Sequence, residues 1–195
     1  MIKVELKDGS IIEVEEGKSI LDLTTDERAR LGIFLAMQDP ISIEGLSNSE
    51  FLKTAISETT GEKVGLFEFI KTLEKEMKNL KLNESMLHRS LNQGFSGGEK
   101  KKNEILQMLV LNPKLAILDE TDSGLDVDAI KIVSKGIEMF KNDENGVLII
   151  THNTRILNHL KVDYVHVLVN GQIVKTSTAE LAEQIEETGY AQYKK

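Results

Sequence analysis

The chain has 195 residues, and 40% of them are hydrophobic, so it can bury a core and is not a disordered chain. Its formal net charge of −8 argues against broad contact with a nucleic-acid backbone. Because it has no cysteine, disulfides, thiolate catalysis and metal or iron–sulfur sites held by its own thiolates are excluded. No apolar run reaches membrane-spanning length, and we expect a cytoplasmic protein without a signal peptide or membrane contact.

The N-terminal segment alternates apolar and charged residues. Residues 2–6 and 12–15 both alternate in this way around Asp8-Gly9, which predicts a polar β-hairpin. Thr24 or Thr25 is expected to cap a short helix, with acidic residues in its first turn. The apolar run 33–37 then predicts a strand.

Residues 41–91 have the pattern of a compact helical block. Ser47, with Ser49 and Glu50, is expected to open one helix. A second helix is predicted from an apolar stripe near helical spacing, with lysine and glutamate between its members. The stripe consists of Phe67, Ile70, Leu73, Met77 and Leu80.

Two fully apolar runs in the second half predict a parallel sheet. Leu115–Leu118 and Val147–Ile150 are separated by a helical stripe of Ile130, Val133, Ile137 and Phe140. Short runs that are apolar on both faces are typical of parallel strands covered on both sides, so the fold class is α/β. A hairpin around Asn170-Gly171 and a helix over about 179–187 complete the chain.

The first run delivers two carboxylates, Asp119 and Glu120, at the end of its strand. That placement suits a Mg²⁺ ligand beside a base that activates water. Acids also follow strands simply as turn or cap residues, and the local pattern alone leaves both interpretations open.

A glycine-rich loop, F-S-G-G-E at 95–99, opens the helix that ends before Asn112-Pro113. Two glycines let a ligand approach the backbone, and a helix N-terminus offers free N–H groups to an anion such as phosphate. Ser96 and Glu99 also form the S-x-x-E capping box, so the loop is equally a plain helix cap. The two roles are compatible.

Two further features follow the strands. Asp122 to Asp126 comes directly after the acidic pair, and His152 stands at the end of the second apolar run, where parallel sheets bind ligands. His88, His159 and His166 lack this context and are interpreted as structural or surface residues.

Taken in order, these motifs resemble the nucleotide-binding domain of ABC-type ATPases. The flanking residues D-E-R-A-R-L-G-I-F-L-A-M-Q, F-S-G-G-E-K-K-K-N-E-I-L, D-E-T-D-S-G-L-D-V-D-A and D-Y-V-H-V-L-V-N-G-Q-I-V-K are similar to SufC, the ATPase of the SufBCD iron–sulfur assembly complex. The resemblance runs from about Ser19 to the C-terminus. It implies a parallel β-sheet core with a helical subdomain at about 41–91.

The resemblance also implies catalytic roles. Gln38 would contact Mg²⁺ and the attacking water, and Asp119 would orient Mg²⁺. Glu120 would polarise the water, and His152 would sense the γ-phosphate of ATP. The cofactors implied are ATP and Mg²⁺.

Other implied roles concern association. Ser96, Gly97 and Gly98 would bind the γ-phosphate of an ATP held by the opposing subunit of a transient homodimer, and Asp126 would span the dimer interface. The implied partners are SufB-like and SufD-like scaffold proteins, with no nucleic acid and no membrane. Because the chain lacks cysteine, we expect it to power or scaffold cluster assembly without holding the cluster.

One element of the family is missing from the printed sequence. No G-x-x-x-x-G-K-[ST] phosphate-binding loop (Walker A) is present, because the first glycine that Gly17-Lys18-Ser19 would need falls on Ile12. Residues 1–16 are therefore expected as a polar hairpin in place of the family's N-terminal P-loop portion, with the ATPase domain over 17–195. Two functions stay open: an ATP-hydrolysing subunit, or a catalytically impaired, truncated or degenerate chain that binds partners.

Overall fold

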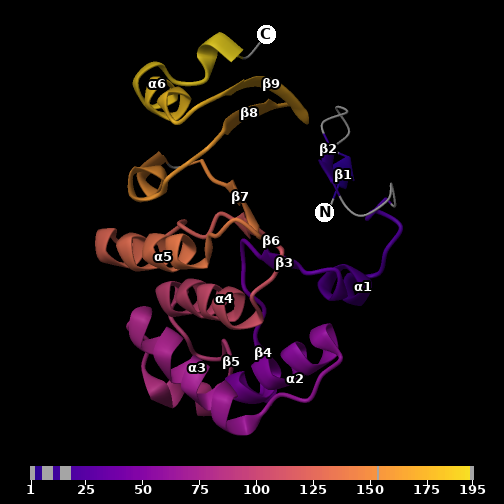
Figure 1. Cartoon of the computed structure of the whole chain (residues 1–195). Helices are drawn as coiled ribbons and strands as arrows, with labels where there is room; N and C mark the ends of the chain where they lie inside the picture. The colour runs from indigo at the N-terminus through magenta and orange to yellow at the C-terminus, as the bar shows by residue number, and fades with distance from the viewer. Residues whose placement is uncertain (1–2, 6–10, 14–18, 153, 194–195) are drawn as a thin grey trace. The chain divides into compact units, whose positions relative to one another are not determined.

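The structure is a computed structural model that describes residues 3–5, 11–13, 19–152 and 154–193 (Figure 1). The chain divides into two compact units, residues 29–160 and residues 1–28 with 161–195. Among the described residues, no helix is both long and apolar enough to traverse a lipid bilayer.

The larger unit is built on a three-stranded parallel sheet. Its strands are β3 (Ile33–Ala36), β6 (Leu115–Asp119) and β7 (Gly146–Ile150), in the order β3-β6-β7. Leu35 pairs with Ile117, which pairs in turn with Leu148. The two apolar runs are thus adjacent parallel strands, which confirms the predicted α/β fold class.

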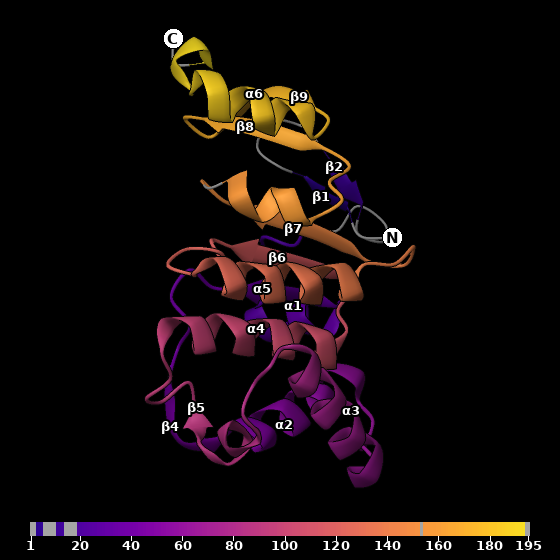
Figure 2. The ribbon, with the colours of Figure 1, turned by 90° about the vertical axis from the view of Figure 1, so that its left-hand side faces the viewer.

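Two helices cover one face of this sheet. In Figures 1 and 2, α4 (Gly97–Leu111) and α5 (Val127–Phe140) run side by side. They share a core with Ala36, Ala116 and Leu118, and the predicted stripe of α5 is buried. The strands are not covered as fully as expected on the opposite face, because Leu35 and Ile150 remain about half exposed.

The block at 41–91 contains more than helices. Its elements are β4 (Ile43–Ser47), α2 (Asn48–Thr60), α3 (Leu66–Asn79), the 3₁₀ helix η2 (Glu84–His88) and β5 (Ser90–Leu91). The expectation of a wholly helical stretch is wrong at both ends, where β4 and β5 pair antiparallel. That pairing joins segments far apart in sequence, so the local hydrophobic periodicity cannot reveal it. The predicted start of a helix at Ser47 is confirmed, and the structure shows that Ser47 forms a capping box with Glu50.

The predicted stripe of α3 is also partly wrong. The helix buries Phe69, Leu73 and Met77, whereas Phe67 is 81% exposed and Ile70 44% exposed. Apolar residues occur on two faces of this helix, so the spacing alone could not decide which face packs against the core.

The smaller unit consists of short elements. Its strands form two antiparallel pairs, β1 (Lys3–Glu5) with β2 (Ile11–Glu13), and β8 (Val165–Val169) with β9 (Gln172–Ser177). Helix α6 (Glu180–Thr188) packs its apolar side on β8, and a 3₁₀ turn, η4 (Ala191–Tyr193), follows. The hairpin at Asn170-Gly171 is confirmed, while the turn expected at Asp8-Gly9 lies outside the described residues. Helix α1 (Thr25–Arg30) carries the chain into the larger unit, and the 3₁₀ helix η3 (Thr154–His159) follows β7 there.

Candidate functional site

The carboxyl ends of β3, β6 and β7 bring three predicted residues together. Gln38 Nε2 donates a hydrogen bond to Glu120 Oε2 at 2.9 Å, and His152 Nδ1 lies 3.1 Å from Glu120 Oε1. Each residue follows one of the three neighbouring strands, so the order of the sheet creates the cluster. A carboxylate held between an amide and an imidazole is arranged to orient a water molecule and to accept its proton.

Glu120 occupies a strained backbone position. Its φ of +46° lies in the left-handed region, which non-glycine residues rarely adopt, and its N–H bonds to the carbonyl of Ile150. The bond to Ile150 fixes the turn at the end of β6 beside β7. Strain of this kind is often found where a side chain must be aimed at a site.

Asp119 precedes Glu120 at the last position of β6 and is half-buried. Its backbone pairs with β7, and the structure records no hydrogen bond or ion pair for its carboxylate within the described residues. With Gln38 and Glu120 it supplies oxygen donors, the type that Mg²⁺ prefers. The described residues include no cluster of three or more His, Asp or Glu side chains placed to hold a metal ion. This donor set fits Mg²⁺ only in the usual manner, with one or two carboxylates and the remaining positions filled by phosphate and water.

The glycine-rich loop forms a helix cap that leaves donors free. Ser96 caps α4 through its Oγ, and the Glu99 carboxylate accepts the N–H of Ser96 at 2.8 Å. The pKa of Glu99 is lowered most by this backbone bond and next by the bond from the Ser96 hydroxyl. The box leaves the N–H groups of Gly97 and Gly98 without a recorded protein acceptor in the described part of the chain. Those two amides are suited to an anion.

Arg89 stabilises this loop. Its guanidinium donates to the carbonyls of Gln93 and Gly94 and lies 4.7 Å from the centroid of the Phe95 ring. The loop therefore enters α4 along a fixed path. Sequence reasoning missed Arg89, because its contact with Phe95 spans six positions and has no motif.

Two residues that the motifs grouped together have different surroundings. Asp126 caps α5 by accepting the N–H of Ala129 at 2.7 Å, so its observed contact is a structural one. Asp122 is buried, and Thr151 Oγ1 donates to it at 2.9 Å, which ties the loop after β6 to the end of β7. No hydrogen bond among the described residues joins Ser96, Gly97 or Gly98 to the Gln38–Glu120–His152 cluster.

Two charged residues of α4 hold the backbone at the end of β3. Lys101 Nζ donates to the carbonyl of Met37 at 3.0 Å and to that of Gln38 at 2.6 Å, while Glu104 Oε1 accepts the N–H of Met37 at 2.9 Å. Both side chains are buried, and Lys101 Nζ lies 4.0 Å from Glu104 Oε2. Burial raises the pKa of Glu104 to about 7, against the opposing effects of the Met37 bond and the Lys101 charge.

This clamp, formed by Lys101 and Glu104 on Met37 and Gln38, was not predicted. Lys100-Lys101-Lys102 has the pattern of a solvated helix face, and only the fold shows that the middle lysine is buried. A helical spacing that put Lys101 on the same face as Ile105 was the available signal.

Comparisons with known proteins identify the family of this chain. Residues 2–123 match the family model described as ABC transporter. The chain belongs to the ABC transporter ATPase family. It is 48% identical over 190 residues to "Vegetative protein 296" of Bacillus subtilis (strain 168), covering 96% of this chain and 72% of that protein.

Other relatives of this ABC ATPase carry transporter names. It is 51% identical to "Probable ABC transporter ATP-binding protein SpyM3_0208" of Streptococcus pyogenes serotype M3, covering 90% of this chain and 70% of that protein. It is 49% identical to "Probable ATP-dependent transporter ycf16" of Cyanophora paradoxa, covering 90% and 69%. The printed names support the ABC family and do not distinguish SufC within it.

Solved ABC cassettes share its fold. A structure titled "Structure of ATP binding subunit of ABC transporter" has a TM-score of 0.70 at 25% identity, covering 94% of this chain and 71% of that one. The ATP-binding cassette MJ0796, solved as a dimer bound to ADP and Pi, has a TM-score of 0.68 at 20% identity, covering 81% and 68%.

Proposed function

We propose that this chain is the SufC-like, ATP-binding and ATP-hydrolysing subunit of an iron–sulfur cluster assembly complex. The observation that supports the ATPase part is the Glu120 carboxylate, held at 2.9 Å by Gln38 and at 3.1 Å by His152. The motif flanks that resemble SufC support the assignment within the family.

In the proposed reaction, water attacks the γ-phosphorus of ATP while the bond from that phosphorus to the β-phosphate oxygen breaks. Glu120 orients the water and accepts its proton, and Gln38 and His152 hold the carboxylate in place. Mg²⁺, when bound by Asp119 and Gln38, supplies positive charge that neutralises the phosphate oxygens. ATP, Mg²⁺ and these residue roles are parts of the proposal.

A second subunit completes the proposed site. The free amides of Gly97 and Gly98, with the Ser96 hydroxyl, would bind the γ-phosphate of an ATP carried by the other member of a transient homodimer. Asp126 would lie at the dimer interface. SufB-like and SufD-like scaffold proteins are the proposed partners, and the iron–sulfur cluster would sit on them rather than on this cysteine-free chain.

One observation favours the alternative of a catalytically impaired partner-binding module. The printed sequence contains no G-x-x-x-x-G-K-[ST], the motif whose amides and lysine hold the phosphates of ATP. In this alternative the fold and the partner surface function without turnover.

Calorimetric titration with ATP and Mg²⁺ tests the proposal, together with co-purification with SufB-like and SufD-like proteins. The proposal expects Mg²⁺-dependent binding of ATP that weakens in Asp119→Ala, which removes the proposed Mg²⁺ ligand, and not in the exposed control Glu144→Ala, and it expects co-purification with both scaffolds. Co-purification without ATP binding would favour the alternative. If the scaffolds do not associate and an ABC membrane subunit does, the assignment to SufC is wrong.

A further inference from the structure

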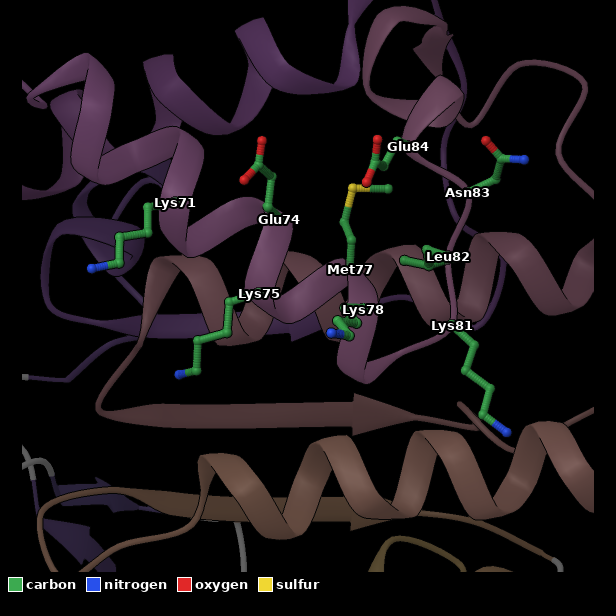
Figure 3. A pocket seen from close by; sticks show the side chains of 9 residues that line it. All are labelled: Lys71, Glu74, Lys75, Met77, Lys78, Lys81, Leu82, Asn83 and Glu84. Atoms are coloured by element: carbon green, nitrogen blue, oxygen red, sulfur yellow. The ribbon is translucent and has the colours of Figure 1, made fainter.

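A hollow of about 800 Å³ opens on α3 and on the loop that follows it (Figure 3). Met77 and Leu82 provide its apolar part, and none of its lining residues belongs to the Gln38–Glu120–His152 cluster. Four lysines surround it: Lys71, Lys75, Lys78 and Lys81. In Figure 3, Lys71, Lys75 and Lys81 extend away from Met77 into the surroundings of the hollow.

These four lysines outnumber the two acidic residues of the lining, Glu74 and Glu84, so the hollow is locally positive on a chain whose net charge is −8. All four are exposed. Lys75 pairs with Glu76 at 2.9 Å, but the described residues provide no ion pair for Lys71, Lys78 or Lys81. Three lysines are therefore available to carboxylates from another molecule.

One of these lysines, Lys81, has a strained backbone conformation. Lys81 has a φ of +50°, a region in which a glycine would be relaxed and a lysine is strained by about 1 kcal/mol. The bonds from Lys81 N–H to Lys78 O and from Leu82 N–H to Met77 O close α3 at this point. The negative end of the helix dipole accounts for Lys78 and Lys81 but not for Lys71, two turns earlier.

An apolar patch continues from the lysines toward the start of α3. Leu66, Phe67 and Ile70 are 60%, 81% and 44% exposed. Phe67, Lys71 and Lys78 lie at positions i, i+4 and i+11 along one side of the helix. Contiguous exposed apolar residues beside charges mark interaction surfaces, whereas single ones do not.

We propose that this surface, the α3 face, docks an acidic amphipathic segment of a protein partner. The α3 face is defined by Phe67, Ile70, Lys71, Lys78 and Lys81. Apolar residues of the partner would cover Phe67 and Ile70, and its carboxylates would pair with the lysines.

The charges around the hollow favour a polypeptide over other polyanions. Glu74 and Glu84 flank Met77 in Figure 3, and they would repel a continuous row of phosphates. The proposal goes beyond the assembly function, because it depends on neither ATP nor the identity of the scaffolds.

A labelled synthetic peptide with leucine and glutamate at helical spacing tests the chemistry by fluorescence anisotropy. The double variant Lys71→Glu/Lys78→Glu should weaken its Kd by about tenfold or more, since both lost attractions become repulsions. The control Lys53→Glu/Lys135→Glu has the same change in net charge on exposed lysines of α2 and α5, and it should alter the Kd by less than about twofold. Equal weakening in both variants would overturn the proposal.

Photo-cross-linking tests the occupant. Benzoylphenylalanine is introduced at Phe67 in the full chain, which is irradiated in a bacterial extract, and the attached segment is sequenced. An acidic segment with apolar residues at helical spacing, lost in Lys71→Glu/Lys78→Glu, is the expected result. The proposal is overturned by no adduct, by a neutral or basic segment, by attachment to RNA, or by anionic vesicles that displace the synthetic peptide.

Discussion

At the residue scale, the left-handed backbone of Glu120 should make a glycine variant more stable than an alanine variant, which is the reverse of the order in a helix. Both Glu120→Gly and Glu120→Ala remove the side chain, but only glycine is relaxed at a φ of +46°. We expect the glycine variant to be more stable than the alanine variant by about 1 kcal/mol.

Urea unfolding of the two variants measures this difference. Glu58, an exposed residue within α2, provides the matched control. There Glu58→Gly should be less stable than Glu58→Ala by about 1 kcal/mol. If the order at residue 120 is the same as at residue 58, the left-handed turn at the end of β6 is incorrect.

Glu104 makes stability depend on pH. Its pKa is raised from 4.5 to about 7 by burial, so in that window the folded state binds a proton that the unfolded state has released. Stability should therefore fall as pH rises through the window, by up to about 3 kcal/mol, and the loss is complete above the folded pKa.

The variant Glu104→Gln keeps an oxygen that can accept the Met37 N–H and removes the titration. We expect the free energy of unfolding of this variant, relative to that of the unmodified chain, to rise between about pH 5 and about pH 8. Denaturant titrations at several pH values, with the exposed Glu58→Gln as control, provide the measurement. A constant difference between the Glu104→Gln variant and the unmodified chain across this range would contradict the raised pKa.

At the element scale, the packing of α4 against α5 depends on Gly136. A Cβ built at this residue would lie 2.5 Å from Ile105 Cγ2 and 3.0 Å from Leu80 Cδ2. Overpacking should outweigh the gain in helix propensity, so Gly136→Ala should destabilise by about 1 kcal/mol and Gly136→Val by about 3 kcal/mol.

Thermal or urea unfolding tests this order. The compensating variant Gly136→Ala/Ile105→Leu removes the clashing Cγ2 methyl group, because leucine is not branched at Cβ, and should recover part of the loss. A stabilising Gly136→Ala would show that the two helices are farther apart than the structure places them.

The elements that the sequence predicted are those whose signal is local. Val147–Ile150 could be recognised as a buried strand because four apolar residues stand together, and Ser47 as a cap because its partner Glu50 lies three residues away. Strand β4 was missed because it exists through pairing with β5, which is far away in sequence. The buried face of α3 was misjudged because Phe67 and Phe69 are equally apolar.

The candidate site shows the same division. Glu120 and His152 were predicted because each follows an apolar run, and Gln38 through the resemblance to ABC-type ATPases. The parallel order of the sheet then brings the three residues together. Lys101 and Glu104 were missed because burial of a charged pair is decided by what packs around it. The run K-K-K-N-E does not by itself single out the middle lysine, and the helical spacing from Lys101 to Ile105 was the one available signal.

At the scale of the whole molecule, we predict that the purified chain alone hydrolyses ATP poorly or not at all. In a homodimer each F-S-G-G-E loop would face a subunit without a phosphate-binding loop, so donors would reach the γ-phosphate from one side only. Positioning and charge stabilisation supply most of the rate in this chemistry, and both would be reduced.

Phosphate release measured for the chain, for Glu120→Gln and for the control Glu144→Gln tests this prediction. Mixed with an intact SufC-type ATPase, the chain should support at most one composite site per heterodimer, through Ser96, Gly97, Gly98 and Asp126. Robust turnover of the chain alone that Glu120→Gln abolishes would contradict the prediction. It would point to Gly17-Lys18-Ser19, of which Gly17 and Lys18 lie outside the described residues.

The clamp on Met37 and Gln38 has a mechanical consequence. Lys101 of α4 donates to the consecutive carbonyls of Met37 and Gln38, while Glu104, about one turn later, accepts the N–H of Met37. Three hydrogen bonds therefore link the first two turns of α4 to the end of β3. We expect a displacement of the start of α4 to move the backbone at Gln38, whose side-chain amide donates to Glu120.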